Sequence, residues 1–256
     1  MATPRAARAT IGSRRVTLRA VTFDYWDTLY TGAVLTERMA LRQTALRHML
    51  TGLGHEIADE ALQALYHESG KEADRWWRDE HRGYTAADRI RWILQRLAIE
   101  RPENCEHVAR AVQAVDDALL VFPPPLLAGA GHALAAIGAR FRLGIISDTG
   151  FASGRAQDAL LERDGLRSHF EVTVYSVDVG HAKPRREPFR AALDALDLAP
   201  GDVLHIGDNE RTDVRGALDA GMRAVRVDFV KQNGPSSAER VVRSFNDLTE
   251  YLATVS

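Results

Sequence analysis

Apolar and polar residues follow two different periods along this chain. Short runs rich in β-branched residues, of the kind that form buried strands, occur at 16–24 and again after residue 140. The later runs are 141–148, 170–176, 202–208 and 223–229. Stretches with helical spacing separate them, and this alternation predicts a parallel α/β sheet.

The stretch from Thr36 to Leu120 is different, because its apolar residues recur three and four positions apart with few β-rich runs. We expect four helices there. Thr36 and Thr85 are predicted N-caps, since each hydroxyl precedes an amphipathic stretch, and the glycines near 52–54 are predicted to end the first helix. The prolines of "FPPPLLAGA" (122–130) end the helical region.

One strand therefore precedes an all-helical insert, and the other strands follow it. We predict a Rossmann-like parallel-sheet core domain made of 16–32 and 121–256. An all-helical cap domain at 33–120 is inserted after the first strand, and residues 1–15 form a flexible tail.

Composition indicates a globular protein that acts on small molecules. The chain has 256 residues, 45% of them hydrophobic, and no apolar run long enough to span a membrane. A net charge of −2 gives no general attraction to nucleic acid. The single cysteine, Cys105, excludes an internal disulfide and fits a reducing compartment, so we expect a cytoplasmic protein without membrane partners. The pattern leaves the oligomeric state open.

Polar residues stand where three predicted strands end. Asp24 follows the first strand, Ser147 and Asp148 follow the second, and Asp208 follows the run at 202–208. Ligands of open parallel sheets bind outside the carboxyl ends of the strands, so we expect the functional site at this edge.

Three carboxylates, those of Asp24, Asp208 and Asp213, are expected to converge at that edge. Clustered carboxylates repel one another unless they share a proton or a cation. Magnesium is a hard ion that prefers a few oxygen ligands, so the sequence predicts a Mg²⁺ site, with Asp213 expected to contact the ion through water.

Lys183 is one of three lysines in a chain with 33 basic residues. Most basic residues of the chain are arginines, yet "HAKPRREPF" contains a lysine. This choice indicates a site that needs a compact ammonium group rather than a planar guanidinium group.

Taken in order, four segments resemble the haloacid dehalogenase (HAD) superfamily of hydrolases. They are "FDYWDTL" (23–29), "GIISDTG" (144–150), "HAKPRREPF" (181–189) and "GDNERTDVRGALDAGM" (207–222). The helical insert is similar to that superfamily's cap domain of the type placed after the first motif. The resemblance implies a magnesium-dependent phosphatase that acts on a small phosphorylated metabolite.

The resemblance also implies a role for each motif residue. Asp24 would be the nucleophile that forms an aspartyl-phosphate, Ser147 would donate to a phosphoryl oxygen, and Lys183 would balance the charge and hold Asp24. The implied metal ligands are Asp24, Asp208, Asp213 and the backbone carbonyl of Trp26. Thr28 and Asp148 are the implied substrate-binding residues.

Trp26 departs from the family pattern. Phosphatases of the superfamily usually carry there a second aspartate, which protonates the leaving oxygen. General acid–base assistance contributes roughly 10²–10⁴-fold, so its loss predicts slow hydrolysis or substrates with good leaving groups. Asp27 is the nearest replacement, although it leaves the strand in another direction.

Other functions stay open. A 2-haloacid dehalogenase also carries an aromatic residue at this position, but Asp208 beside Asp24 argues against it. A phosphonoacetaldehyde hydrolase would need a cap lysine as Schiff base, and Lys71 is the only lysine in the insert. A non-catalytic module that binds a phosphometabolite or a protein is the alternative of another class.

The neighbouring Trp76 and Trp77 lie on a predicted helix of the insert, where they are candidates to line the cleft. Adjacent helical positions face different ways, so at least one of the two is expected to pack inside the insert.

Overall fold

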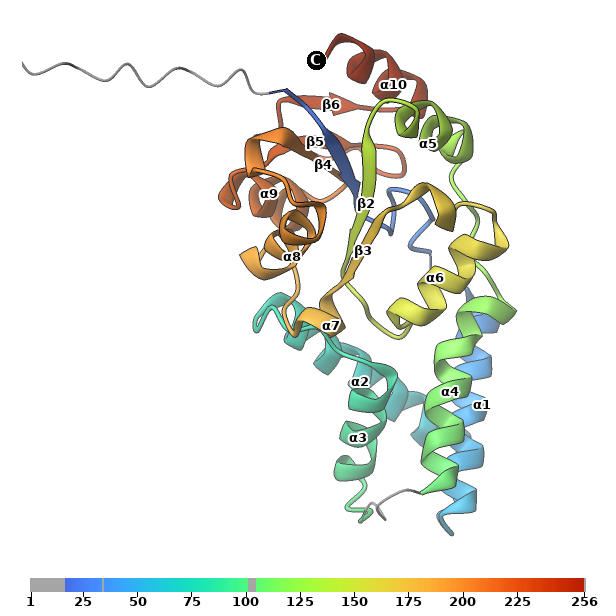
Figure 1. Ribbon diagram of the computed structural model, residues 1–256. Coiled ribbons are helices and arrows are strands. Elements are labelled where there is room, and N and C mark those ends of the chain that lie inside the picture. The colour runs from blue at the N-terminus through green and yellow to red at the C-terminus, as the bar shows by residue number, and fades with distance from the viewer. Residues whose placement is uncertain (1–16, 34, 101–104, 256) are drawn as a thin grey trace, which may run out of the picture.

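A six-stranded parallel sheet forms the centre of the protein (Figure 1). The computed structural model describes residues 17–33, 35–100 and 105–255. The strands are β1 (Ala20–Phe23), β2 (Arg142–Ser147), β3 (Val172–Tyr175), β4 (Val203–Gly207), β5 (Arg223–Val227) and β6 (Arg240–Val242). Their order is β3-β2-β1-β4-β5-β6, which confirms the predicted Rossmann-like α/β fold.

The chain moves outward from β1 in both directions. β1 pairs with β2 on one side and with β4 on the other, all parallel. In such doubly wound sheets the point where the strand order reverses leaves a crevice at the carboxyl ends of the two strands. Here that point lies between β1 and β4, where Asp24 and Asp208 follow their strands.

Helices cover both faces of the sheet. They are α5 (Ala130–Gly138), α6 (Gly154–Arg163), α7 (Ser176–Val179), α8 (Arg186–Leu196), α9 (Arg215–Asp219) and α10 (Phe245–Thr254). Because side chains alternate along a strand, Val21 and Phe23 of β1 belong to the core under α5, α6 and α10. Ala20 belongs to the core under α8 and α9. Figure 1 shows these two sets of helices on opposite sides of the strands.

The insert after β1 contains the four expected helices. They are α1 (Thr36–Gly52), α2 (Asp59–Arg78), α3 (Ala86–Arg96) and α4 (Glu106–Val121). They have an apolar core of their own, which includes Leu50, Leu62, Ile93 and Val115. Figure 1 shows them below the sheet, at the end where β3 runs into α7. This arrangement is that of a helical cap inserted after the first strand.

Local details agree with the sequence predictions in part. Thr85 caps α3 through a reciprocal pair of hydrogen bonds with Asp88. The prediction of Thr36 as an N-cap is wrong, because Leu35 holds that position without a side-chain hydrogen bond and Thr36 is already helical. The predicted tail at 1–15 lies outside the described residues, and the exact domain boundaries stay predictions. None of the described helices combines the length and apolarity needed to cross a bilayer.

Three kinds of contact join the insert to the sheet domain. Phe151, from the loop between β2 and α6, reaches the insert, where the Arg89 guanidinium lies 3.4 Å from its ring centre. The Ala182 amide donates to the His81 carbonyl at 2.8 Å. A Cβ on Gly83 would lie 2.4 Å from the Ser176 carbonyl oxygen, so only glycine allows this approach of the two backbones.

Close packing in the core makes two glycines respond oppositely to the same substitution. A Cβ on Gly216 would lie 2.7 Å from the buried Phe189 ring, so we expect Gly216→Ala to lower the free energy of unfolding by about 1–3 kcal/mol through overpacking. Gly131→Ala meets Leu166 at an ordinary 3.7 Å and is expected to raise it by about 0.5–1 kcal/mol. Urea denaturation of both variants measures the difference, and equal stabilities would contradict this account of the packing.

Candidate active site

A cavity of about 450 Å³ lies between the carboxyl ends of the strands and the insert. The loops after β1, β2 and β4 line it, together with the segment that carries Lys183. The insert contributes Asp74, Trp77 and Tyr84. The predicted site residues on the wall are Asp24, Trp26, Asp148, Lys183, Asp208 and Asp213.

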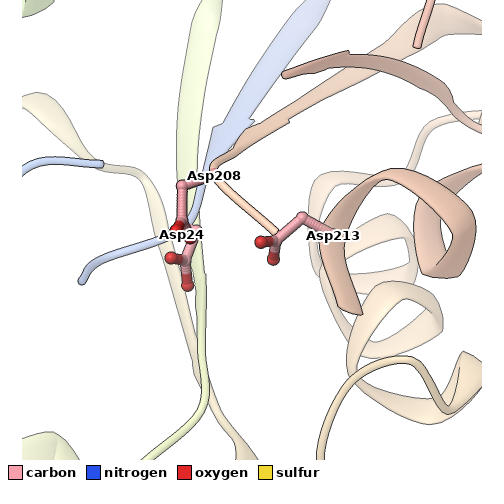
Figure 2. Close-up of side chains that lie close together, drawn as sticks. All are labelled: Asp24, Asp208 and Asp213. Atoms are coloured by element: carbon pink, nitrogen blue, oxygen red, sulfur yellow. The ribbon is translucent and has the colours of Figure 1, made fainter. Parts of the chain in front are cut away.

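Three carboxylates meet in this cavity. Asp24, Asp208 and Asp213 each offer one oxygen, and these oxygens all lie within 4.8 Å of one another. Figure 2 shows Asp24 and Asp208 side by side, with Asp213 facing them from the turn of helix at Glu210–Val214. The convergence expected from the strand ends is therefore present in the fold.

Lys183 holds the cluster together. Its Nζ donates to Asp24 Oδ1 at 2.5 Å, to Asp213 Oδ1 at 2.6 Å and to the Ile146 carbonyl at 2.9 Å. Burial alone would lower the pKa of Lys183, but Asp213 and Asp24 attract its charge and raise that pKa above its usual range. The ammonium therefore stays charged although its side chain is only 2% exposed.

Asp213 is tied into the protein through both oxygens. Asp213 Oδ1 accepts a hydrogen bond from Lys183 Nζ and lies 3.4 Å from His205 Nε2. Oδ2 accepts a hydrogen bond from the Asn209 backbone amide at 3.0 Å. Burial would raise the pKa of Asp213, but Lys183 and His205 hold it below its usual range. This anchoring fits the expectation that Asp213 contacts a cation through water.

His205 also contacts the Asp213 carboxylate. Burial lowers the pKa of His205, so the ring is neutral, and its Nδ1 lies 3.0 Å from the Thr22 hydroxyl of β1. If the Thr22 hydroxyl donates to Nδ1, then Nε2 carries the proton and points it at Asp213.

The other two carboxylates keep free oxygens. In the described part of the chain, Asp24 Oδ2 and the Asp208 carboxylate accept no hydrogen bond. Burial raises the pKa of Asp24 well above its usual value, and burial with the repulsion of Asp213 and Asp27 raises the pKa of Asp208 to about 7. Such a pair fits a cation, which would remove the repulsion that raises both values. Within the described residues the Trp26 carbonyl is also without a hydrogen-bond donor.

Trp26 follows Asp24 by two residues in the loop after β1. Its indole packs edge-on against Tyr25, with ring centres 4.9 Å apart, and lines the cavity. Asp27 also lines the cavity, but its Oδ1 accepts the Gly32 amide at 2.6 Å and its Oδ2 lies 3.8 Å from Lys231 Nζ. Asp27 thus turns back toward its own loop, with a φ of 54°.

Asp148 joins the insert to the sheet domain. Its Oδ2 accepts the Trp77 indole N–H at 2.8 Å, and its Oδ1 accepts the Lys183 backbone amide at 2.9 Å. The Arg211 guanidinium lies 5.2 Å from the Trp77 ring centre. Trp77 therefore stands on the cavity wall while Trp76 is buried against Tyr84, which separates the two tryptophans as helical geometry requires.

Two predicted residues lie behind the wall. The Ser147 hydroxyl donates to Gln157 Oε1 at 2.8 Å, and the buried Thr28 hydroxyl has no partner among the described residues. Neither residue lines the cavity, so their predicted contacts with substrate stay predictions. Lys71 is exposed and also lies off the wall.

The sequence reasoning missed several wall residues, namely Asp74, Tyr84, Thr149, Gly150, Asn209, Thr212 and Lys231. Thr149, Gly150, Asn209 and Thr212 lie inside the recognised segments 144–150 and 207–222, where sequence reasoning assigned them no role of their own. Asp74 and Tyr84 carry no such signal, because only the docking of the insert brings them here.

Comparison with known proteins agrees with this geometry. Residues 18–221 match the family described as haloacid dehalogenase-like hydrolases. The glyceraldehyde 3-phosphate phosphatase of Methanopyrus kandleri is 31% identical over 82% of this chain and 84% of its own length. This chain belongs to the haloacid dehalogenase-like hydrolases.

Solved structures share the fold of this hydrolase. The 2-haloacid dehalogenase of Pseudomonas syringae superposes with a TM-score of 0.68 at 22% identity, over 93% of this chain and 99% of the other. A HAD hydrolase of Bacillus subtilis, bound to magnesium, superposes with a TM-score of 0.58 at 21% identity, over 92% of this chain and 99% of the other. At these identities the likeness establishes the fold.

The raised pKa of Asp208 predicts how stability depends on pH without metal. The folded protein keeps a proton on Asp208 up to about pH 7, whereas its ordinary pKa is 3.8. The chain therefore loses stability as pH rises from about 4 to 7, with a slope of up to roughly 1.4 kcal/mol per pH unit for one proton. Asp208→Asn should lower this slope by the share of one proton in chemical denaturation with chelator present, and the share of Asp24, whose pKa is also raised, should remain.

A matched control is Asp219→Asn, which makes the same charge change at an exposed position. It should leave the slope in place. Excess Mg²⁺ should restore the stability of the unsubstituted protein at neutral pH and have little effect on Asp208→Asn. An unchanged slope in Asp208→Asn would refute the electrostatic account of the cluster.

Proposed function

We propose that this hydrolase is a magnesium-dependent phosphatase that takes the phosphoryl group of a small phosphorylated metabolite onto Asp24. The observation that carries the proposal is the setting of Asp24. Lys183 Nζ donates to Asp24 Oδ1 at 2.5 Å. Asp24 Oδ2 accepts no hydrogen bond among the described residues, and Asp24 lies beside Asp208 at the carboxyl ends of the strands. A buried carboxylate kept in one orientation by an ammonium is arranged as a nucleophile.

Magnesium suits the donors of this site. Asp24, Asp208 and the Trp26 carbonyl would hold the ion, and Asp213 would contact it through water, all as oxygen donors of the kind that Mg²⁺ prefers. The Bacillus subtilis hydrolase of the same fold is bound to magnesium. When bound, the ion would offset the charge of the carboxylates and polarise a phosphoryl oxygen.

The chain's own groups then account for two steps. Asp24 attacks phosphorus, so that a bond forms between its oxygen and phosphorus while the bond to the leaving oxygen breaks. Water next attacks the phosphorus of the aspartyl-phosphate, releasing phosphate and restoring the carboxylate. Lys183 stays hydrogen-bonded to Asp24 and offsets negative charge throughout. For Ser147 to donate to a phosphoryl oxygen, its hydroxyl would have to leave Gln157.

The leaving oxygen receives no proton from position 26. An indole is not an acid in water, and Asp27 is engaged with Gly32. The favoured substrates therefore have leaving groups that are stable as anions or draw a proton from solvent, and turnover of simple alkyl phosphates is slow.

One alternative keeps a specific observation in its favour. Dehalogenation of a 2-haloacid needs no proton on the leaving halide, and Trp26 is compatible with it. The cluster of Asp208 and Asp213 beside Asp24 opposes it, because that reaction gains nothing from a cation. Lys71 is exposed, which removes support for a Schiff base in the cleft and hence for phosphonoacetaldehyde hydrolysis.

We further propose that the hydrolase acts in the cytoplasm on small molecules rather than on nucleic acid. The net charge of −2 and the free Cys105 support this setting.

The proposal is tested first with Asp24→Asn. The unsubstituted protein should hydrolyse p-nitrophenyl phosphate with Mg²⁺ and stop when the metal is chelated. Asp24→Asn should lose at least about 10³-fold in kcat, because an amide is no nucleophile here. Activity that survives chelation on 2-haloacids alone would establish dehalogenation, and undiminished phosphate binding without any turnover would establish a non-catalytic binder.

If position 26 lacks a general acid, an aspartate introduced there should speed the hydrolysis of alkyl phosphates. Trp26→Asp should raise kcat on an alkyl phosphate such as glycerol 3-phosphate by about 10²-fold or more, and raise it far less on p-nitrophenyl phosphate. Trp26→Asn makes the same loss of packing without an acid and serves as the control. If both variants hydrolyse the alkyl ester equally slowly, proton supply at position 26 does not limit this enzyme. If in addition Asp27→Asn abolishes alkyl-ester activity, Asp27 is the acid.

A further inference from the structure

A second cavity adjoins the active site. It measures about 360 Å³, and four of its wall residues, Trp26, Asp27, Gly32 and Gly150, also line the active-site cavity. The rest of its wall comes from the loop after β1, α1, α4 and the loop after β2, namely Ala33, Arg38, Arg42, Leu119, Phe151 and Ala152. The two cavities are therefore neighbours with Trp26 on their shared wall.

Their charges are opposite. The active-site wall carries six carboxylates and two lysines. The second cavity has two arginines, Arg38 and Arg42, against the single carboxylate of Asp27. Asp27 is already engaged with the Gly32 amide and faces Lys231 on its other side.

Both arginines are buried, and neither forms an ion pair with a residue that the structure describes. Arg38 is 6% exposed and Arg42 is 7% exposed, and in the described part of the chain neither has a carboxylate within 4.0 Å. Arg38 donates through Nε and Nη2 to the Phe122 carbonyl, and Arg42 donates through Nε to the Val115 carbonyl. Among the described residues Arg38 Nη1 makes no hydrogen bond, and the Arg42 guanidinium has only the neighbouring Tyr66 hydroxyl as a further acceptor.

Buried charges without a partner are costly, and such groups are normally paired. Burial lowers the pKa of both guanidinium groups, which expresses the same cost. The charge of the nearby Asp116 offsets part of this cost for Arg42, but that carboxylate forms its ion pair with Arg155 at 2.6 Å and accepts the Ser153 amide and hydroxyl. The chain thus leaves a positive site beside its reaction centre for an anion from outside.

We infer that the second cavity is a subsite for an anionic group at the far end of the substrate, a carboxylate or a second phosphoryl group, bound by Arg38 and Arg42. This inference rests on the proposed function and specifies its substrate class. The reacting phosphoryl group would lie at the carboxylate cluster, and the carbon chain would pass along Trp26 to the arginines. Guanidinium groups suit both carboxylate and phosphate oxygens, since each offers paired donors.

Arg89 provides a matched control. It is 4% exposed, has no carboxylate partner among the described residues, and lies over the same Phe151 ring, at 3.4 Å against 4.4 Å for Arg42. It lines neither cavity. Arg42→Met and Arg89→Met therefore each remove a buried guanidinium group that lies over the Phe151 ring. Only Arg42 lines the proposed subsite.

The experiment compares substrates that differ at the far end. One pair is 3-phosphoglycerate and glycerol 3-phosphate, and the other is fructose 1,6-bisphosphate and fructose 6-phosphate. The unsubstituted enzyme should favour the anionic member of at least one pair in kcat/KM by about 10–100-fold, the effect of charged hydrogen bonds. The pair that shows the preference identifies carboxylate or phosphoryl as the far group.

The preference should vanish in Arg42→Met, remain in Arg89→Met and be partly retained in Arg42→Lys, which keeps the charge without the fork. Equal loss of preference in Arg42→Met and Arg89→Met would overturn the inference, as would an unsubstituted enzyme that hydrolyses both members of each pair equally. If Arg42→Met does not fold, Arg38→Gln and Arg42→Lys decide by the same ratio.

Failure of the proposed function is recognised separately by calorimetry on the Asp24→Asn variant. Tighter binding of 3-phosphoglycerate than of glycerol 3-phosphate, lost with Arg42→Met, would support the subsite even if no phosphate ester is hydrolysed. Hydrolysis of many esters without any preference for an anionic far end would leave the phosphatase standing and remove the subsite.

Discussion

The three hydrogen bonds of the Lys183 ammonium are the interaction on which the site depends. They join Asp24 at the end of β1, Asp213 after β4 and the Ile146 carbonyl of β2, so one side chain links three neighbouring strands at their carboxyl ends. A buried ammonium and two buried carboxylates are each costly alone, but together they satisfy one another. The pairing leaves Asp24 oriented and leaves the charge of Asp208 unbalanced, which is the condition that a divalent cation meets.

Around this centre the protein separates charge over a short range. Carboxylates dominate where the strands end. In the neighbouring cavity, between α1 and the loop after β2, two arginines dominate that form no ion pair within the described part of the chain. Trp26 stands on the wall of both cavities. Its apolar indole therefore lies between a carboxylate-rich cavity and an arginine-lined one.

The insert is held over this centre by contacts of several kinds. Trp77 donates to Asp148, Phe151 enters the insert beside Arg89, and Gly83 lets two backbones approach. The carboxylate of Asp148 accepts two hydrogen bonds, one from Trp77 of the insert and one from the backbone amide of Lys183. Docking of the insert and placement of Lys183 are therefore physically linked.

The sequence by itself determined the sheet, the helical insert and the converging acids, because strand runs, helical spacing and strand-end acids are local patterns. It missed β6, which has only three residues, and it misplaced the cap of α1 by one residue. Only the tertiary structure decided that Ser147 turns to Gln157, that Trp77 rather than Trp76 faces the cavity, and that Arg38 and Arg42 lie beside the reaction centre. The positions of Trp77 and of the two arginines depend on how the insert packs against the sheet, and the Ser147 contact depends on how α6 packs beside β2. Packing of this kind leaves no periodic pattern in the sequence.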